Sequence, residues 1–148
     1  MQFEGIYTPV ITPFHNDGSV DKEGFAEVLE FLIDAGTHGI VVAGTTGEYY
    51  AQTAEERTHL MQYAHQVING RLPMMVGVGA IRTEDSIELA QIARQTGADA
   101  LLVNSPPYVL PTETENAAHA LAIDQAADLP IMLYNYPGRT GVGMGEDY

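Results

Sequence analysis

An α/β fold with a parallel sheet is predicted, because strand-like and helix-like segments alternate along all 148 residues of the sequence. Short apolar runs recur roughly every 30 residues, which is about the length of one strand–helix unit with its loops. These runs span residues 5–11, 39–43, 74–78, 100–104 and 131–135. No linker or low-complexity tract interrupts the pattern, so the whole chain is expected to belong to one domain.

The first two helices have recognisable start and stop signals. Apolar residues of the segment 25–33 fall on one face at helical spacing, and Gly36 is expected to end that helix. Thr53 stands three residues before Glu56, which is the spacing of a capping box. Thr53 is therefore expected to open the second helix, and Gly70 to end it.

The third and fourth helices are bounded in the same way. Thr83 is expected to open the third helix, which should end at Gly97. Thr112 and Glu115 repeat the capping-box spacing before an alanine-rich helix that should end near Asp128.

A (β/α)8 barrel of the TIM type is favoured over a doubly wound sheet. Polar, turn-forming residues follow every strand, as a ring of active-site loops requires. The dinucleotide fingerprint needs a third glycine after Gly77-Val78-Gly79, but Arg82 stands there, so this pair is interpreted as close packing and a tight turn. Five strands and four helices are expected, and a whole barrel needs roughly 200 residues. Residues 1–148 are therefore expected to be the amino-terminal half of a single barrel.

The composition excludes several classes of partner and site. A formal net charge of −14 disfavours nucleic acids and anionic membranes as partners. The chain has no cysteine, which excludes disulfides, thiolate metal ligands and cysteine nucleophiles, and fits the cytoplasmic location that we expect. Its five histidines include no pair at i, i+4 spacing, so no metal site is expected.

The most informative motif is Gly44-Thr45-Thr46-Gly47-Glu48, directly after the second apolar run. The two glycines allow a sharp turn and a close approach of the backbone to a ligand. The two threonines offer hydroxyl and N–H donors to a small carboxylate. Because α/β proteins bind ligands at the carboxyl ends of parallel strands, these four residues are candidate substrate-binding residues. The simpler alternative is a glycine turn with two solvated threonines.

Three further candidates follow later strands. Tyr134 is expected at the end of the fifth strand, in the same layer as Thr45, and a phenol there can transfer protons through a neighbouring hydroxyl. Arg139 presents a fork of donors that suits a carboxylate. Tyr108 follows two prolines after the fourth run, which fix its direction. The alternatives are a buried tyrosine with a satisfied hydroxyl, an arginine paired with a surface acid, and a structural Tyr108.

Taken in order, these motifs resemble the dihydrodipicolinate synthase/N-acetylneuraminate lyase superfamily. The resemblance rests on residues 44–48, Pro107-Tyr108 and residues 134–141, together with the opening segment 5–14 and the turn at Gly18. It implies a class I aldolase-type lyase on a (β/α)8 barrel that forms a Schiff base between a lysine and pyruvate or another 2-oxo acid. No cofactor is implied, and the complete protein is expected to be a homodimer or homotetramer.

The resemblance also implies roles for the candidates. Thr45 and Thr46 would hold the carboxylate of the 2-oxo acid, while Tyr134 would move protons during imine formation and carbon–carbon bond making. Thr45 and Tyr108 would complete the proton relay, with Tyr108 supplied by a neighbouring protomer. Arg139 would bind the carboxylate of the second substrate, an aldehyde, which is aspartate semialdehyde in the synthase branch.

The Schiff-base lysine that the resemblance implies would lie on a sixth strand, beyond residue 148. Lys22 is the only lysine of the chain, and its neighbours Asp21 and Glu23 predict a solvated charge near a helix start. The 148-residue chain alone is therefore expected to be inactive. Two alternatives stay open: another 2-oxo acid aldolase, dehydratase or deaminase of the same family, or a half-barrel without catalytic activity.

Overall fold

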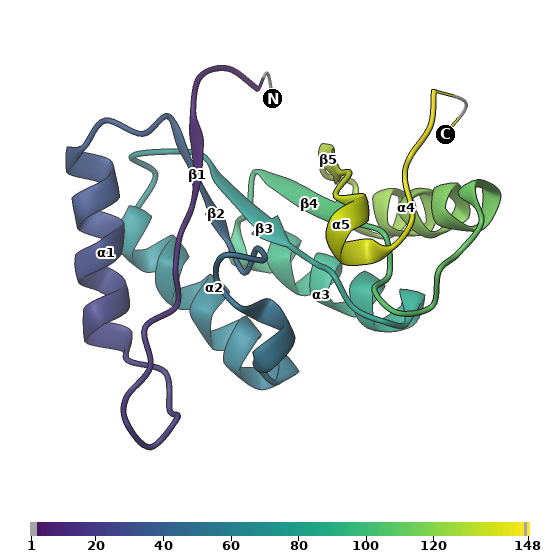
Figure 1. Ribbon diagram of the computed structural model, residues 1–148. Coiled ribbons are helices and arrows are strands. Elements are labelled where there is room, and N and C mark those ends of the chain that lie inside the picture. Colours follow the sequence, from purple (N-terminus) through teal and green to yellow (C-terminus); the bar gives the residue numbers. More distant parts are fainter. Residues whose placement is uncertain (1–2, 147) are drawn as a thin grey trace.

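The computed structural model describes residues 3–146 and 148 of the chain. Its five strands form one parallel sheet in chain order, β1-β2-β3-β4-β5 (Figure 1). The strands are β1 (Tyr7–Pro9), β2 (Gly39–Val42), β3 (Met74–Gly77), β4 (Ala100–Asn104) and β5 (Ile131–Tyr134). All neighbouring pairs are parallel, and β4 and β5 align Asn104 with Tyr134. The predicted α/β fold is confirmed, with the five strands and their helices arranged as a half-barrel.

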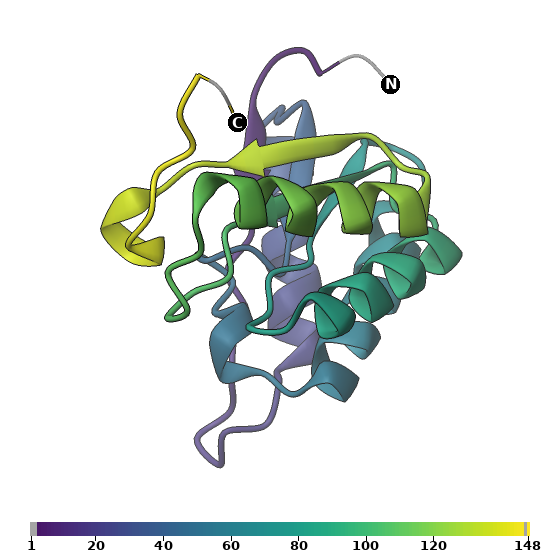
Figure 2. The same cartoon turned by 90° about the vertical axis from the view of Figure 1, so that its right-hand side faces the viewer.

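Four helices connect successive strands and lie on one side of the sheet, as Figures 1 and 2 show. They are α1 (Lys22–Asp34), α2 (Ala54–Ile68), α3 (Thr83–Thr96) and α4 (Glu113–Ala127). Each packs against the next, so the helices follow one another around the sheet. Two short helices that were not predicted follow strand ends, namely the 3-10 helix η1 (Tyr49–Ala51) and α5 (Pro137–Thr140). Within residues 3–146 and 148, no helix combines the length and the apolar character needed to cross a membrane.

The main core lies between the sheet and the helices. Every residue of β2 and β3 is buried, because both faces of these central strands are covered. Large fully buried side chains of this core include Phe25, Leu29, Ile40, Met61, Met74, Leu101 and Ile123. Side chains alternate between the two faces of a strand, so Val41, Met75 and Ala100 form a second, smaller cluster on the other face.

The two outer strands are less buried than the central ones. β1 is shorter than the predicted run 5–11, and Ile6 and Ile11 beside it are 67% and 51% exposed. A strand with a neighbour on one side only makes half of the ladder contacts, so its ends leave the sheet early. On β5, Leu133 is 41% exposed. The carboxyl ends of all five strands nevertheless share one edge of the sheet, which is where the candidate residues were predicted to meet.

Helix ends agree with the predicted capping residues, with differences of one residue at the ends of α1 and α2. α1 ends on Ala35, one residue before the predicted Gly36. Both predicted capping boxes form, at Thr53 and at Thr112. Gly97 ends α3 with a φ of 94°. α2 ends on Asn69, one residue before the predicted Gly70, because asparagine tolerates the left-handed φ of 46° found there.

Candidate active site

The segment after β2 forms a tight turn that begins and ends on strained residues. Ala43 and Glu48 have φ angles of 55° and 56°, in the left-handed region that residues other than glycine rarely adopt. Between them, the N–H of Gly47 donates to the carbonyl of Gly44 at 3.0 Å. The N–H of Glu48 donates to the carbonyl of Thr45 at 3.1 Å. Such strain persists only where the surrounding structure holds the turn in place.

Contacts from two other segments hold Gly47. The hydroxyl of Thr12 donates to the Gly47 carbonyl at 2.8 Å, and the side-chain amide of Gln52 donates to the same oxygen at 2.7 Å. A Cβ at position 47 would lie 3.0 Å from the carbonyl oxygen of Val10. Glycine therefore lets the turn pack closely against the segment that follows β1, where a Cβ would force a small shift of the backbone.

The end of β3 also requires glycine, and this explains the Gly77-Val78-Gly79 pair. A Cβ on Gly77 would lie 2.9 Å from the carbonyl carbon of Ala43 and closer still to its oxygen. A Cβ on Gly79 would lie 3.0 Å from Cγ of Asn104. Close packing accounts for both glycines, as the sequence pattern suggested.

A cavity of about 230 Å³ opens where these strand ends meet. Thr45 reaches it from the turn after β2, Tyr134 from the end of β5, and Arg139 from α5. The structure therefore brings Thr45 together with Tyr134 and Arg139, which lie about 90 positions further along the chain, and the motifs singled out all three. Within the described part of the chain, the lining residues are Thr45, Tyr49, Tyr50, Asn104, Pro107, Tyr134, Arg139 and Thr140.

The other predicted site residues lie elsewhere. Gly44 and Gly47 belong to the turn after β2 and are buried, but they do not line the cavity. Thr46 is exposed and does not line the cavity either. Tyr108 is 88% exposed, with a left-handed φ of 77°, and it does not line the cavity either. The roles assigned to all of these residues stay predictions.

Local contacts explain the residues around Tyr134 and Arg139. The side chain of Asn135 accepts from the N–H of Met144 and donates to its carbonyl, both at 3.1 Å, which ties the segment after α5 back to the strand end. Thr140 is buried, and its hydroxyl lies 3.2 Å from the carbonyl of Tyr136 and 3.0 Å from that of Val142. Thr140 thus forms part of the wall, with its hydroxyl engaged by the backbone.

Sequence reasoning missed Tyr49 and Asn104 as lining residues. Asn104 is only 8% exposed and is the last residue of a strand that is otherwise apolar. An amide at the end of a buried strand was a usable signal, because buried polar groups need partners. Tyr49 had no comparable signal, since its place depends on the left-handed Glu48 before it.

A buried arginine supports this side of the cavity. Arg57 on α2 is 5% exposed, and its guanidinium donates to the carbonyls of Gly77 at 2.8 Å and Gly79 at 2.9 Å. Its central carbon lies 5.1 Å from the centre of the Tyr49 ring, within the range of a cation–π interaction. Burial lowers the pKa of Arg57 to about 10, so the side chain stays charged at neutral pH.

The cavity itself is almost uncharged. Of the residues that the structure describes, Arg139 is the one ionic side chain that lines it. Burial raises the pKa of the Tyr49 phenol, and the Asn104 amide and the Arg57 charge oppose that rise, so the phenol is neutral at physiological pH. Among the residues that the structure describes, no group of three or more histidine, cysteine, aspartate or glutamate side chains could hold a metal ion.

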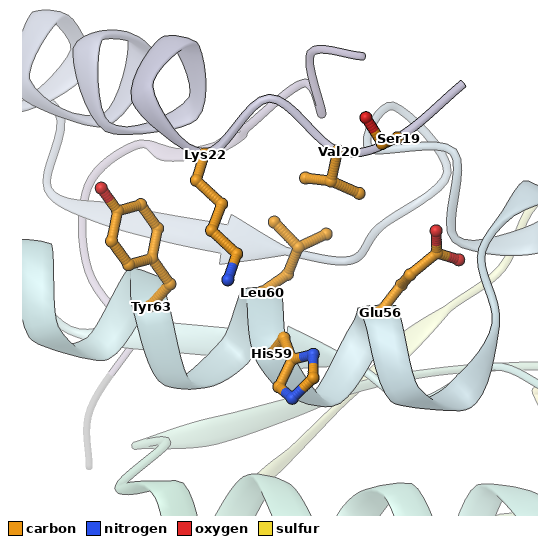
Figure 3. A pocket seen from close by; sticks show the side chains of 7 residues that line it. All are labelled: Ser19, Val20, Lys22, Glu56, His59, Leu60 and Tyr63. Atoms are coloured by element: carbon orange, nitrogen blue, oxygen red, sulfur yellow. The ribbon is translucent and has the colours of Figure 1, made fainter. Parts of the chain in front are cut away.

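Lys22 does not take part in this cavity. It is exposed at the start of α1 and extends toward α2, where it lines a separate cavity of about 220 Å³ (Figure 3). The other side chains of that cavity are Ser19, Val20, Glu56, His59, Leu60 and Tyr63. This agrees with the prediction that Lys22 is a solvated charge.

Comparisons with known sequences agree with the family resemblance of the motifs. Residues 2–147 match the model of the dihydrodipicolinate synthetase family. The 4-hydroxy-tetrahydrodipicolinate synthases of Desulfotalea psychrophila and Bacillus subtilis are 42% and 41% identical over 146 and 147 residues. Both alignments cover 99% of this chain but only 49% and 51% of the relatives. The chain thus spans about half the length of the relatives it matches.

Solved structures give the same picture. The crystal structure of an Acinetobacter baumannii dihydrodipicolinate synthase complexed with pyruvate matches with a TM-score of 0.95 at 40% identity. That match covers 99% of this chain and 50% of the other. CdNal from Clostridium difficile, at 24% identity, matches with a TM-score of 0.96, which shows the shared fold alone.

Proposed function

Because the chain belongs to the dihydrodipicolinate synthetase family, we propose that it forms the amino-terminal half of a Schiff-base lyase acting on pyruvate or another 2-oxo acid. Residues 1–148 would be one half of a single (β/α)8 barrel in a longer polypeptide, the complete enzyme. Two observations support this proposal: the parallel strands lie in chain order, and the relatives are about twice as long as the chain.

The observation that carries the proposed chemistry is that Thr45, Tyr134 and Arg139 line one cavity at the carboxyl ends of parallel strands. Thr45 and the neighbouring Thr46 would bind the carboxylate of the 2-oxo acid. The amine of a lysine beyond residue 148 would attack the ketone carbon, and water would leave to give the imine. The Tyr134 phenol would protonate the departing hydroxyl, and the phenolate would then take a proton from the carbon next to the imine to give the enamine. When the enamine adds to the aldehyde, the phenol would give that proton to the new alkoxide.

The remaining residues would complete the reaction. Arg139 would bind the carboxylate of the aldehyde, because its planar fork suits that group. The high exposure of the Tyr108 ring supports a role outside its own chain, at the site of a second protomer in a homodimer or homotetramer. The names of the relatives support pyruvate and aspartate semialdehyde as the substrates. We also propose that the reaction needs no cofactor, because the imine forms on a lysine of the protein itself. The proposed location is the cytoplasm.

The proposal is tested by incubating the complete enzyme with pyruvate and reducing the mixture with borohydride. We expect a covalent adduct on a lysine beyond residue 148, located by mass spectrometry of peptides. The Lys22→Gln variant should give the same adduct, because Lys22 lies in a separate cavity. The Thr45→Val variant should keep the fold and lose at least about tenfold in turnover, as removal of a proton-transfer group does.

Three results would overturn the proposal. An adduct on Lys22 would show that the nucleophile is misassigned, and unchanged turnover of Thr45→Val would exclude the relay. No adduct at all in the complete protein would favour the alternative, a half-barrel without catalytic activity.

A further inference from the structure

Contacts with two neighbours fix the phenol of Tyr49. The Arg57 guanidinium lies over its ring, with the central carbon 5.1 Å from the ring centre. The Asn104 amide hydrogen-bonds the phenol and opposes the rise of its pKa, so the amide is the donor and the phenol oxygen is the acceptor. An N–H of the same amide also donates to the carbonyl of Ser105 at 2.8 Å. A phenol that accepts a hydrogen bond still has its own proton to donate, and this proton points away from the amide.

The Tyr49 hydroxyl lies near the proposed proton-transfer residue. Tyr49 and Tyr134 line the same cavity. Asn104, which holds the Tyr49 oxygen, is the direct partner of Tyr134 in the sheet register, so the side chains of Asn104 and Tyr134 project to the same face from adjacent strands. The two phenols are close enough that an ionised Tyr134 raises the pKa of Tyr49. Tyr49 can therefore donate to the Tyr134 oxygen directly or through a bridging water.

A buried positive charge stands behind the Tyr49 ring. Arg57 is 5% exposed, and its guanidinium donates to the carbonyls of Gly77 and Gly79. Among the residues that the structure describes, no carboxylate forms an ion pair with it. Because Arg57 is already buried within this chain, the rest of a complete barrel has little access to it. With a pKa of about 10 the side chain is charged at neutral pH, so it favours negative charge on nearby groups.

The proposed chemistry requires this kind of support for Tyr134. After giving its proton to the departing hydroxyl, Tyr134 would act as a phenolate base. A free phenol ionises only near pH 10, so a phenolate that works at neutral pH needs hydrogen-bond donors around its oxygen. The hydroxyl of Thr45 is one candidate donor in the cavity, and the fixed hydroxyl of Tyr49 is a second.

We propose that Tyr49, held by Arg57 and Asn104, is a positioning residue that donates a hydrogen bond to the phenolate of Tyr134. The inference rests on the proposed function, in which that phenolate removes a proton from the carbon next to the imine. It concerns this first half-reaction with the 2-oxo acid, and it is therefore independent of the second substrate.

The step that the phenolate performs can be measured without an aldehyde. When the complete enzyme is given pyruvate in deuterium oxide, each removal of a methyl proton from the imine leads to exchange for deuterium, which NMR detects. We expect the exchange rate of the wild type to rise with pH as Tyr134 ionises. Tyr49→Phe keeps the ring over Arg57 and removes only the hydroxyl. In this variant the midpoint of the pH profile should rise by about one unit, because a hydrogen bond to a charged group is lost.

The shape of the profile distinguishes this role from a structural one. Tyr49→Phe should exchange several-fold more slowly at neutral pH and recover at high pH, where Tyr134 is ionised in both proteins. A structural defect would lower the rate equally at every pH. In the described part of the chain, Tyr50, Tyr136 and Arg139 also lie around Tyr134, and all three stay unchanged in the test.

Tyr63→Phe is the matched control, because Tyr63 lies on α2 in the separate cavity of Figure 3. It should keep the wild-type profile, and an equal shift in this variant would show that the effect does not depend on the place of Tyr49. Borohydride trapping of pyruvate separates the inference from the proposed function. A wild type with neither adduct nor exchange would refute both. If the wild type traps and exchanges pyruvate, an unshifted midpoint in Tyr49→Phe, or an equal loss of rate at every pH, overturns the inference alone.

Discussion

Replacing Gly77 with alanine should disturb, from the neighbouring strand, the turn of residues 44–48 that we propose binds the substrate carboxylate. The new Cβ would lie 2.9 Å from the carbonyl carbon of Ala43, whereas ordinary contact begins at about 3.4 Å, so the turn must move by roughly 0.5 Å or more. Ala43 already has a left-handed φ of 55°, which leaves its backbone little freedom to adjust. We expect Gly77→Ala to lower the free energy of unfolding of the complete enzyme by about 2 kcal/mol, as overpacking does.

The same displacement should slow the formation of the pyruvate adduct by about tenfold or more, because small misplacements of binding groups are costly in catalysis. Stability is measured by urea unfolding, and adduct formation by borohydride trapping over time. Gly70→Ala is the control. Gly70 has a left-handed φ of 71°, so alanine there is also strained, but no atom lies within 4 Å of the new Cβ. Gly70→Ala should lower the free energy of unfolding by about 1 kcal/mol and leave the rate of pyruvate trapping unchanged. If Gly77→Ala traps pyruvate as fast as Gly70→Ala, the packing explanation is wrong.

Two further predictions concern pH. Burial lowers the pKa of His119 below 6.5, so the stability due to its neutral form is present above pH 6.5 and lost as the pH falls through the lowered pKa. His119→Gln should flatten this dependence in urea unfolding, and an unchanged slope would contradict it. The Thr53 N–H and hydroxyl lower the pKa of Glu56 from 4.5, so its contribution is present above pH 4.5 and lost at lower pH. Glu56→Gln should reduce the acid-induced fall in melting temperature, and an equal fall in both proteins would exclude the capping box as its source.

Much of the fold follows from local patterns in the sequence. Apolar runs predicted the five strands, and the spacing of Thr53 and Glu56 predicted how α2 begins, because a capping box depends only on residues within one turn. The shortened β1 depends on its position at the edge of the sheet, which no window of sequence contains. Helix caps can thus be predicted from neighbouring residues, whereas the length of an edge strand depends on its place in the assembled sheet.

Some residues of the candidate site could also be predicted from local patterns, and others could not. Thr45 and Tyr134 were found because each lies at or just past the carboxyl end of a strand, so the strand order alone brings them together. Tyr49 was missed because the left-handed φ of Glu48 decides where it points. Arg57 stands in a charged stretch typical of an exposed helix face, yet it is buried against carbonyl groups of another strand. Both depend on tertiary contacts that override local preference.

The packing of each strand and helix on its neighbour in sequence also bears on how quickly the chain can fold. Every strand pairing joins consecutive strands, and each of the four main helices contacts the next. Paired residues of neighbouring strands are 25 to 34 positions apart, so each pairing must close a loop that contains the connecting helix, which is slower than forming local contacts. During synthesis, each new strand emerges when its partner is already in place, so the sheet can grow from β1 toward β5 without waiting for the rest of the polypeptide.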